Sequence, residues 1–462
     1  MSPAPLYDLL VIGSGPAGQK AAIAAAKLGK KVAIVDRREM VGGVCVHTGT
    51  IPSKTLREAI LYFTGFRQKS YYGRNYTLER EIAVSDLAFR VHHVLAREME
   101  VVEAQLERNR VAIWHGTARF LEPHMVEVGT LDGPTSLTAE HILIACGTRP
   151  AHTVGIPFDG TRIIDADQII SLGSLPHELI VVGGGIIGRE YASMLSALGV
   201  EVTLVEQRPS VLEFTDQEIV DTLLYHMRER GATFRLGEQV VSVRIDERNR
   251  VEANLDSGKQ VHADALLYAV ARQANTDLLD LAAAGLEADA RGRIAVDEHY
   301  RTPVPHVYAA GDVIGFPALA STAMEQGRLA SLHMFGQETR ATPQLVPYGV
   351  YAIPELSMVG RTEEELTRDR IPYEVGVARY KELAKAQMMG DETGLLKILF
   401  DPHTLRPLGI HIIGDGATEL IHVGQAAMAL GGTIEYFRDN VFNYPSLAEA
   451  YKVAALDGLN KR

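Results

Sequence analysis

The sequence predicts an α/β protein with two Rossmann-like dinucleotide-binding domains and a smaller C-terminal α+β dimerisation domain. The glycine pattern of a dinucleotide-binding strand–turn–helix occurs twice, at residues 13–18 and again at residues 183–188. A chain of 462 residues is long enough for about three domains. From about Val346 the pattern changes to short strands and helices. We therefore expect segments at 1–150, 151–270, 271–342 and 343–462, with the third completing the first domain.

Composition limits the partners that the chain can bind. Lys and Arg total 46 against 58 Asp and Glu, so the net charge is −12, and the positive field that nucleic acid or anionic membranes favour is missing. No window approaches the roughly 18 apolar residues that a membrane helix needs, and the N-terminus has no basic leader. Two cysteines exclude a disulfide scaffold and suit a reducing compartment. We expect a cytoplasmic protein without a metal site.

The first glycine pattern has its full structural context. An apolar run from Tyr7 leads to Gly13, Gly15 and Gly18, an alanine-rich helix follows, and the next strand ends at Asp36. Glycines let the backbone approach a pyrophosphate, the helix N-terminus supplies N–H donors, and the acid accepts hydrogen bonds from ribose hydroxyls. A dinucleotide site is favoured over a plain tight turn.

The second copy starts at Leu179 and carries Gly183, Gly185 and Gly188 before Glu206 at the end of the next strand. An acid in that place suits the 2′-hydroxyl of NAD and disfavours the 2′-phosphate of NADP. Arg208 lies two residues further on and offsets part of that repulsion. Nucleotide preference stays open at this point.

The remaining segments are assigned from periodicity and turn signals. Residues 86–110 have helical spacing and carry His92 and His93, which we interpret as surface or packing histidines. Short strands are expected between residues 111 and 140, and Cys146 is interpreted as a small buried hydrophobe. Thr362 to Glu365 has the spacing of a capping box, and residues 395–414 read as a hairpin. His422, in an apolar helix, is expected in a core or an interface.

The order of these parts resembles the flavoprotein disulfide reductases over essentially the whole length. Within that family, the stretch GGVCVHTGTIPSKT and the terminal NYPSLAEAYKVAAL are most similar to the pyridine nucleotide transhydrogenase branch. The resemblance implies FAD on the first pattern (1–150 and 271–342), NAD(H) or NADP(H) on the second (151–270), and a homodimer or higher homo-oligomer through residues 343–462. It assigns FAD contacts to Gly13, Gly15, Gly18, Asp36, Gly43, Cys45, Thr50, Lys54, Gly116, Gly311 and Asp312. It assigns NAD(P) contacts to Gly183, Gly185, Gly188, Glu206 and Arg208.

Two positions depart from the disulfide-reducing members. Cys45 occupies the first place of their redox cysteine pair, but Thr50 occupies the second, and a hydroxyl cannot form a disulfide. Near the C-terminus Tyr444 replaces their acid–base histidine, while Glu449 remains. The pKa of a tyrosine is ordinarily about 10, which is too high for it to act as the acid–base group of a thiol at neutral pH. Glu449 also has capping-box spacing from Ser446, which we favour as its role.

Hydride transfer through the flavin alone is the function that these features imply. By resemblance, Lys54 lies near the flavin and pairs with Glu190, which are the catalytic candidates, with Tyr444 and Glu449 as weaker ones. The predicted reaction moves hydride from NADPH to NAD⁺ in a ping-pong order. Alternatives are an NAD(P)H diaphorase or quinone reductase on the same fold and a non-catalytic nucleotide-binding scaffold. We interpret Cys45 as a packing residue, although a nearby lysine or helix end lowers the pKa of some thiols.

Overall fold

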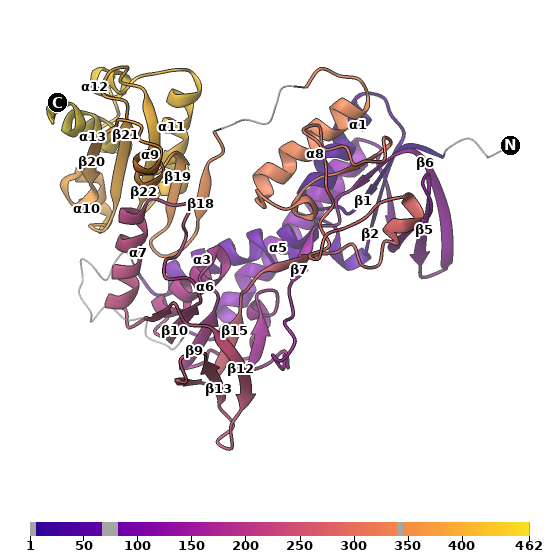
Figure 1. Cartoon of the computed structure of the whole chain (residues 1–462), viewed down its shortest axis with the longest axis horizontal. Helices are drawn as coiled ribbons and strands as arrows, with labels where there is room; N and C mark the ends of the chain where they lie inside the picture. Colours follow the sequence, from indigo (N-terminus) through magenta and orange to yellow (C-terminus); the bar gives the residue numbers. More distant parts are fainter. Residues whose placement is uncertain (1–5, 67–81, 340–344, 462) are drawn as a thin grey trace. The chain divides into compact units, whose positions relative to one another are not determined.

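The computed structural model describes residues 6–66, 82–339 and 345–461 (Figure 1). The chain divides into two compact units. Unit 1 contains residues 1–56, 88–151 and 271–342, and unit 2 contains residues 57–87, 152–270 and 343–462. The predicted boundary between 342 and 343 lies outside the described residues, and our finer four-segment division stays a prediction.

Unit 1 is built on a seven-stranded sheet in the order β3–β2–β1–β6–β5–β4, with β17 also paired to β6. Strands β1, β2, β3 and β17 pair in parallel, whereas β4, β5 and β6 form an antiparallel extension. This places β1 in the middle of the sheet with its carboxyl end at the first glycine turn. The strands are β1 (Tyr7–Ile12), β2 (Val32–Asp36), β3 (Ala112–His115), β4 (Thr117–Glu122), β5 (Met125–Thr130), β6 (Gly133–Ile144) and β17 (Val307–Ala309).

Helices α1 (Pro16–Lys27) and α8 (Ala320–Met334) lie side by side in unit 1, although about 300 residues separate them in sequence (Figure 1). Glycine permits this approach, because a Cβ on Gly327 would lie 2.0 Å from the Ala17 carbonyl oxygen. The alanine face of α1 packs in the same core as Leu106 on α5 (Val84–Arg108). The predicted helix at 86–110 is confirmed, and His92 and His93 are exposed on it. Strands β7 (Thr148–Pro150) and β16 (Arg272–Ala274) form a separate antiparallel pair.

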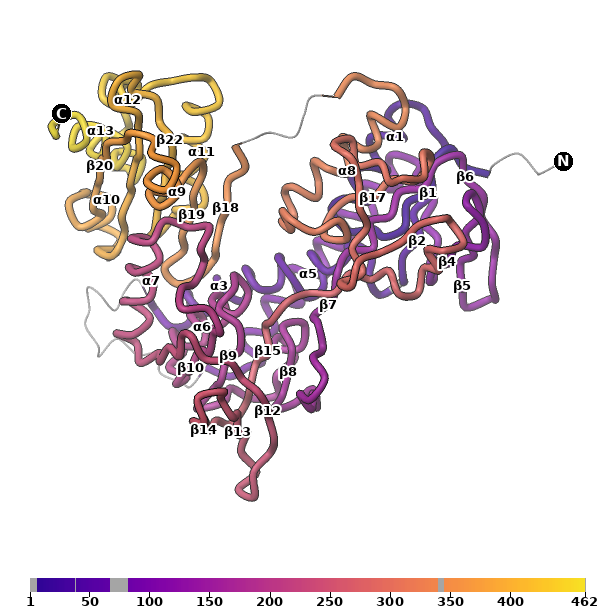
Figure 2. Tube along the Cα trace, in the orientation of Figure 1, coloured from indigo at the N-terminus to yellow at the C-terminus, as the bar shows by residue number. Residues whose placement is uncertain are grey.

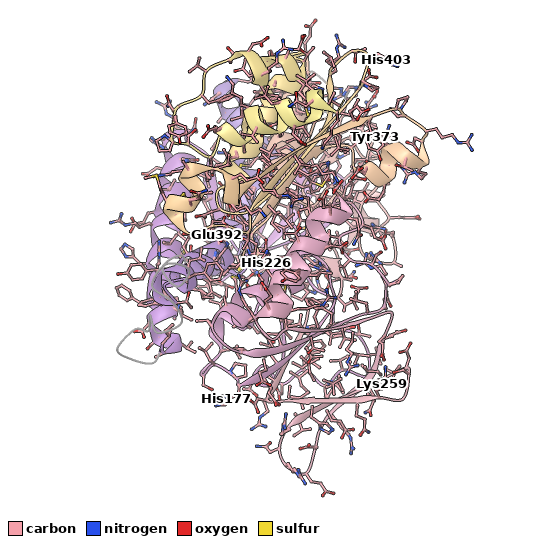
Figure 3. The ribbon with its side chains drawn as sticks, turned by 90° about the vertical axis from the view of Figure 1, so that its left-hand side faces the viewer. His177, His226, Lys259, Tyr373, Glu392 and His403 are labelled. Carbon is pink, nitrogen blue, oxygen red and sulfur yellow. The ribbon has the colours of Figure 1, made fainter. Side chains whose placement is uncertain are left out.

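Unit 2 contains a second, five-stranded parallel sheet in the order β11–β10–β9–β15–β8 (Figure 2). Its central strand β9 leads into the second glycine turn and then α6 (Ile186–Ala197). Helix α7 (Gln217–Glu229) carries His226 (Figure 3). The strands are β8 (Ile163–Asp165), β9 (Glu178–Val182), β10 (Glu201–Glu206), β11 (Thr233–Leu236) and β15 (Ala265–Tyr268), with a separate meander of β12 (Val240–Ile245), β13 (Val251–Leu255) and β14 (Gln260–Ala263).

The C-terminal part of unit 2 is α+β, as expected. Its antiparallel sheet has the order β18–β19–β22–β21–β20, and the predicted hairpin at 395–414 is the pair β21–β22. The capping box from Thr362 to Glu365 is confirmed at the start of α9. The elements are β18 (Tyr348–Val350), β19 (Leu356–Gly360), α9 (Glu363–Arg368), β20 (Glu374–Arg379), α10 (Ala384–Met389), β21 (Leu395–Phe400), β22 (Pro407–Ile413), α11 (Ala417–Ala429), α12 (Ile434–Asp439) and α13 (Glu449–Asn460).

One expectation for this C-terminal part is wrong, and another is answered only in part. His422 is exposed on α11, where its Nδ1 pairs with Gln425 at 2.8 Å, so it is not in the core of this chain, and its interface position stays a prediction. Ser446 and Glu449 do not form a capping box, since α13 begins at Glu449 and its N-cap is Ala448 without a side-chain hydrogen bond. Among the described helices, we find none that combines the length and apolarity needed to cross a bilayer.

Candidate functional site

The first glycine turn joins β1 to α1 with almost no space beneath it. Gly13 has a φ of +104°, and a Cβ on Gly18 would lie 1.9 Å from the Gly13 carbonyl oxygen. Gly15, the N-cap of α1, differs, because a Cβ there would come no closer than 4.0 Å to any atom outside its chain neighbours. The turn is thus packed on its inner side and open at the helix N-terminus, which fits the approach of a pyrophosphate.

Asp36 is held at the end of β2 by the turn itself. Its carboxylate accepts from the Ser14 N–H and Oγ, both at 2.7 Å, and from the Arg37 N–H at 2.8 Å. Burial raises the pKa of Asp36, and the Ser14 bonds oppose that rise. The Gly116 N–H donates to the Asp36 carbonyl oxygen at 2.9 Å, which brings Gly116 to the same edge of the sheet. Asp36 and Gly116, both predicted FAD contacts, therefore lie together.

The stretch at 42–55 contains one short helix and the start of a longer one, and its first residues lie against this turn. Ser14 Oγ also accepts from the Gly42 N–H at 2.9 Å, and a Cβ on Gly43 would lie 2.8 Å from the Cα of Gly15. Cys45 is on α2 (Gly43–His47) and Thr50 begins α3 (Thr50–Phe63). Gly42 and Gly43 therefore lie against the first glycine turn in unit 1.

Cys45 and Thr50 are brought together, but they form no redox pair. Both cysteines of the chain are free thiols. Burial raises the pKa of Cys45, and a hydrogen bond with the Thr50 side chain opposes the rise, as does the weaker influence of Lys54. The thiol is therefore protonated at neutral pH, which supports the packing interpretation over a reactive thiolate. Burial likewise raises the pKa of Cys146 to about 12.

Gly311 and Asp312 follow β17 and lie against α1. The Gly311 N–H donates to the buried Gln326 side chain at 2.8 Å, and the Asp312 carboxylate accepts from Thr148 Oγ1 at 3.3 Å. Asp312 also contributes to the raised pKa of Cys45, so its charge reaches the 42–55 stretch. All the residues that the resemblance assigned to FAD belong to unit 1. Their donors and glycine surfaces fit a bound FAD.

The second glycine turn repeats the first in unit 2. Gly183 has a φ of +104°, a Cβ on Gly188 would lie 2.0 Å from the Gly183 carbonyl oxygen, and a Cβ on Gly185 would meet nothing within 4 Å. The buried Glu206 accepts from the Gly184 N–H at 2.6 Å. It also accepts from the Arg208 N–H and Nε, both at 3.0 Å. Burial opposes its charge, but the bonds from Arg208 and Gly184 lower the pKa of Glu206 overall.

The catalytic candidates fall in both units. Half-buried Lys54 donates to Ser53 Oγ at 3.2 Å, and Glu190, on α6, accepts from the Tyr351 N–H at 2.8 Å. Because Lys54 belongs to unit 1 and Glu190 to unit 2, their pairing stays a prediction. Tyr444 is 72% exposed. Ser446 Oγ and Glu449 Oε2 are buried without hydrogen-bond partners among the described residues.

Several supporting residues were missed by the sequence reasoning. Ser14 lies within the first glycine pattern, and Gln19 and Arg189 lie next to the two patterns. Thr148 and Gln326 bond to Asp312 and Gly311. Gln19 and Arg189 had a usable signal, since each directly follows the last glycine of its pattern. Thr148 and Gln326 had none, because their partners are distant in sequence.

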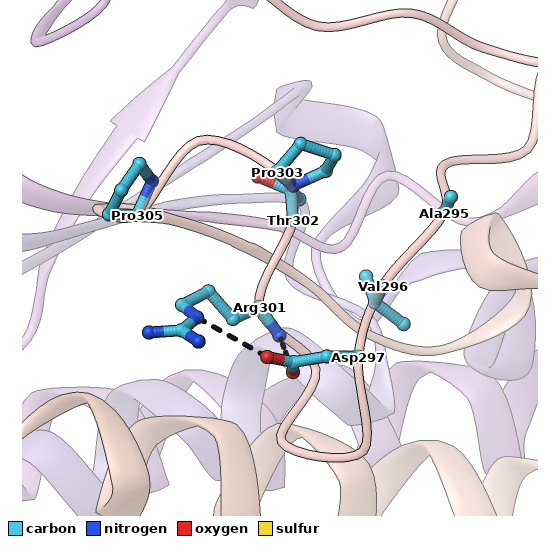
Figure 4. A pocket seen from close by; sticks show the side chains of 7 residues that line it. All are labelled: Ala295, Val296, Asp297, Arg301, Thr302, Pro303 and Pro305. Carbon is cyan, nitrogen blue, oxygen red and sulfur yellow. Dashed lines mark hydrogen bonds and ion pairs between the residues drawn. The ribbon is translucent and has the colours of Figure 1, made fainter.

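A hollow of about 520 Å³ lies elsewhere in unit 1, beside Val296 and Pro303 (Figure 4). Arg301 crosses it, with its N–H donating to the Asp297 carboxylate at 2.9 Å and its Nε at 3.3 Å. Apart from this ion pair, the hollow is lined by Ala295, Val296, Thr302, Pro303 and Pro305, so most of its lining is apolar. The glycine turns remain the better candidate sites.

Comparison with known proteins agrees with this geometry. The family model described as pyridine nucleotide-disulphide oxidoreductase matches residues 7–327, and the dimerisation domain of the same family matches residues 346–455. A soluble pyridine nucleotide transhydrogenase from Mycobacterium bovis is 54% identical over 98% of this chain and 97% of the relative. One from Hahella chejuensis is 46% identical over 98% of each chain.

Solved structures show the same architecture. The HOCl-induced flavoprotein disulfide reductase RclA from Escherichia coli superposes with a TM-score of 0.87 at 28% identity, covering 97% of this chain and 99% of that one. LpdA from Mycobacterium tuberculosis superposes with a TM-score of 0.89 at 28% identity and the same coverage. With two glycine turns of matching geometry and family matches over nearly its full length, the chain belongs to the pyridine nucleotide-disulphide oxidoreductase family.

Proposed function

We propose that the chain is a transhydrogenase that moves hydride from NADPH to NAD⁺. The observation that carries this proposal is the Cys45–Thr50 pair, which occupies the place of a redox disulfide but has a single, protonated thiol. Without a dithiol, a member of this family has no internal store for electrons beyond its flavin. The similarity to proteins named soluble pyridine nucleotide transhydrogenase supports the same reaction.

In this proposal the first turn would hold FAD, which would supply the hydride chemistry that links the two nucleotides. Gly13, Gly15 and Gly18 let the backbone approach its pyrophosphate, and Asp36 accepts from its ribose. Gly43, Gly116, Gly311 and Asp312 complete the surface. Lys54 supplies positive charge near the reacting ring and Glu190 holds that lysine in place. The geometry of the first glycine turn supports the roles of its glycines and Asp36, whereas the roles of Lys54 and Glu190 rest on the resemblance alone.

The second glycine turn binds the two nucleotides one after the other. Gly183, Gly185 and Gly188 approach the pyrophosphate, while Glu206 and Arg208 meet the adenosine ribose, whether it carries a hydroxyl or a phosphate. One turn for two chemically similar substrates requires that the first product leaves before the second substrate enters. A homodimer through residues 346–455 completes the proposal, because that segment matches the dimerisation domain of the family.

Anaerobic spectroscopy tests donor, cofactor and acceptor together. NADPH is expected to bleach the flavin absorbance of the purified protein, and an NAD⁺ analogue added afterwards is expected to restore it. Initial velocities measured at several fixed acceptor concentrations should give parallel lines. Protein without flavin, or flavin that NADPH leaves oxidised, would contradict the enzyme assignment. Restoration by quinones but not by the NAD⁺ analogue would instead identify a diaphorase or quinone reductase.

A further inference from the structure

Arg189, the first residue after the last glycine of the second turn, has a fully buried side chain. Its Nε donates to the Gly184 carbonyl oxygen at 2.7 Å, whereas Nη1 and Nη2 have no hydrogen-bond partner among the described residues. Burying a cation is costly unless it is paired. The fold therefore retains a charge here at the expense of stability, and supporting one carbonyl does not account for it.

The first turn shows that a neutral residue can do the same structural work. Gln19 occupies the equivalent place after Gly18, and its Nε2 donates to the Ser14 carbonyl oxygen at 2.7 Å. The two contacts are the same in chain position and in length. Support of the turn thus needs an N–H donor and not a cation, so the charge of Arg189 has another consequence.

The charge of Arg189 is coupled to the acid of the second turn through Gly184. The Gly184 carbonyl accepts from Arg189, and the Gly184 N–H donates to Glu206 at 2.6 Å. Glu206 in turn accepts from the Arg208 Nε at 3.0 Å. Two guanidinium groups and one carboxylate give this cluster a net charge of +1. The corresponding Asp36 of the first turn is held by Ser14 and by a backbone N–H, and no guanidinium among the described side chains bonds to it.

The protonation state supports this count. Burial lowers the pKa of Arg189 to about 9, while Glu206 raises it and Arg208 lowers it further. A guanidinium with this pKa remains protonated at neutral pH. The pKa of Glu206 is lowered overall, so the carboxylate remains charged as well.

We propose that Arg189 determines nucleotide specificity as a positioning residue, whose buried charge offsets Glu206 so that the second turn accepts the 2′-phosphate of NADP(H) as well as the 2′-hydroxyl of NAD(H). The inference rests on the proposed function in assigning both nucleotides to this turn. Arg208, which is partly exposed, is the group that meets the phosphate. Arg189 does not contact the phosphate, but its charge removes the net repulsion that Glu206 alone would exert on the 2′-phosphate.

Equilibrium binding to the flavin-containing protein tests the inference without turnover. The Arg189→Gln variant keeps a donor for Gly184, as Gln19 does in the first turn. We expect it to raise the dissociation constants of NADP⁺ and 2′,5′-ADP roughly tenfold, and those of NAD⁺ and 5′-ADP less than about twofold. Arg189→Lys, which keeps the charge, should keep the ratio near that of the parent protein. Arg230→Gln is the matched control, because Arg230 is a half-buried arginine of the same unit, bonded to the Ile353 carbonyl.

A charge rescue separates electrostatics from folding. The double variant Arg189→Gln/Glu206→Gln has the +1 charge of the parent cluster, so it should recover affinity for 2′,5′-ADP. Equal losses for phosphorylated and unphosphorylated ligands in Arg189→Gln, or no recovery in the double variant, would overturn the inference. If Arg189→Gln fails to fold, the inference would be overturned by a change, in Arg189→Lys, in the ratio of the dissociation constants for phosphorylated and unphosphorylated ligands. Absent hydride exchange together with the expected binding ratios would refute the proposed function alone.

Discussion

Cys45 and Lys54 give opposite predictions at the scale of single residues. Because burial keeps the Cys45 thiol protonated and Thr50 cannot form a disulfide, Cys45→Ser should retain most hydride transfer.

Lys54→Met removes the positive charge assigned to the flavin and should slow flavin reduction by roughly tenfold or more, about 1.4 kcal/mol. Stopped-flow reduction by NADPH at matched flavin content measures both. Near-complete loss of transfer in Cys45→Ser with FAD intact would contradict the packing role.

Residues were predicted well from sequence where their chemistry depends on neighbours in the chain. Asp36 and Glu206 were identified because a strand–turn–helix fixes the place of the acid. His422 is exposed and not in the core of the chain, because its apolar neighbours Ile421 and Val423 occupy other faces of the helix, about 100° away on each side. Its interface position stays a prediction. Ser446 and Glu449 have the spacing of a capping box, but the helix begins only at Glu449 and its N-cap is Ala448. Ser446 therefore precedes the N-cap position.

The glycine turns act as elements, and matched alanine substitutions should separate their two ligands. A Cβ on Gly18 or Gly188 would collide with a backbone oxygen at 1.9 or 2.0 Å. Such overpacking costs about 1–3 kcal/mol, or roughly ten- to hundredfold in affinity where the turn holds the ligand. Gly18→Ala should therefore lose FAD during purification, and Gly188→Ala should retain FAD but bind NADP⁺ and NAD⁺ weakly.

Flavin content and nucleotide titration provide these measurements. Gly173→Ala is the control, because a Cβ there would meet nothing within 4 Å. Loss of FAD from Gly188→Ala, or an unchanged flavin content in Gly18→Ala, would show that the two turns do not bind separate nucleotides.

Elements with a strong local signal were predicted closely. Both strand–turn–helix units, the helix over residues 84–108 and the hairpin β21–β22 appear near the expected positions, because each depends on periodicity or turn chemistry within a short window. The pairing of β17 with β6 and the packing of α8 on α1 lacked such a signal. They depend on long-range contacts between small residues, such as Ala17 and Gly327, that no local pattern indicates.

At the scale of the whole molecule, unit 2 is joined by a buried ion cluster that sequence reasoning did not find. Fully buried Lys397 on β21 donates to Asp216 at 3.0 Å, to Glu218 at 3.1 Å and to Glu363. About 180 residues separate Lys397 from Asp216, so a lysine within an apolar strand gave no sign of its partners. The cluster connects the start of α7 in the nucleotide-binding part of the unit with α9 and β21 in the C-terminal part.

Removing this lysine should destabilise unit 2. Lys397→Met leaves Asp216, which is also fully buried, without its counter-ion, and breaking a buried pair costs about 3–5 kcal/mol. Lys397→Met/Asp216→Asn should recover part of the loss, since no uncompensated charge then remains at Asp216. Burial opposes the charge of Lys397, but its three carboxylates raise the pKa overall. Its stabilisation is therefore complete below the unfolded lysine value of about 10.4 and lost only as the pH rises through the higher folded value. Thermal unfolding between pH 6 and 9 should show a constant difference between parent and variant, and a difference that disappeared within this range would refute the ion-pair account.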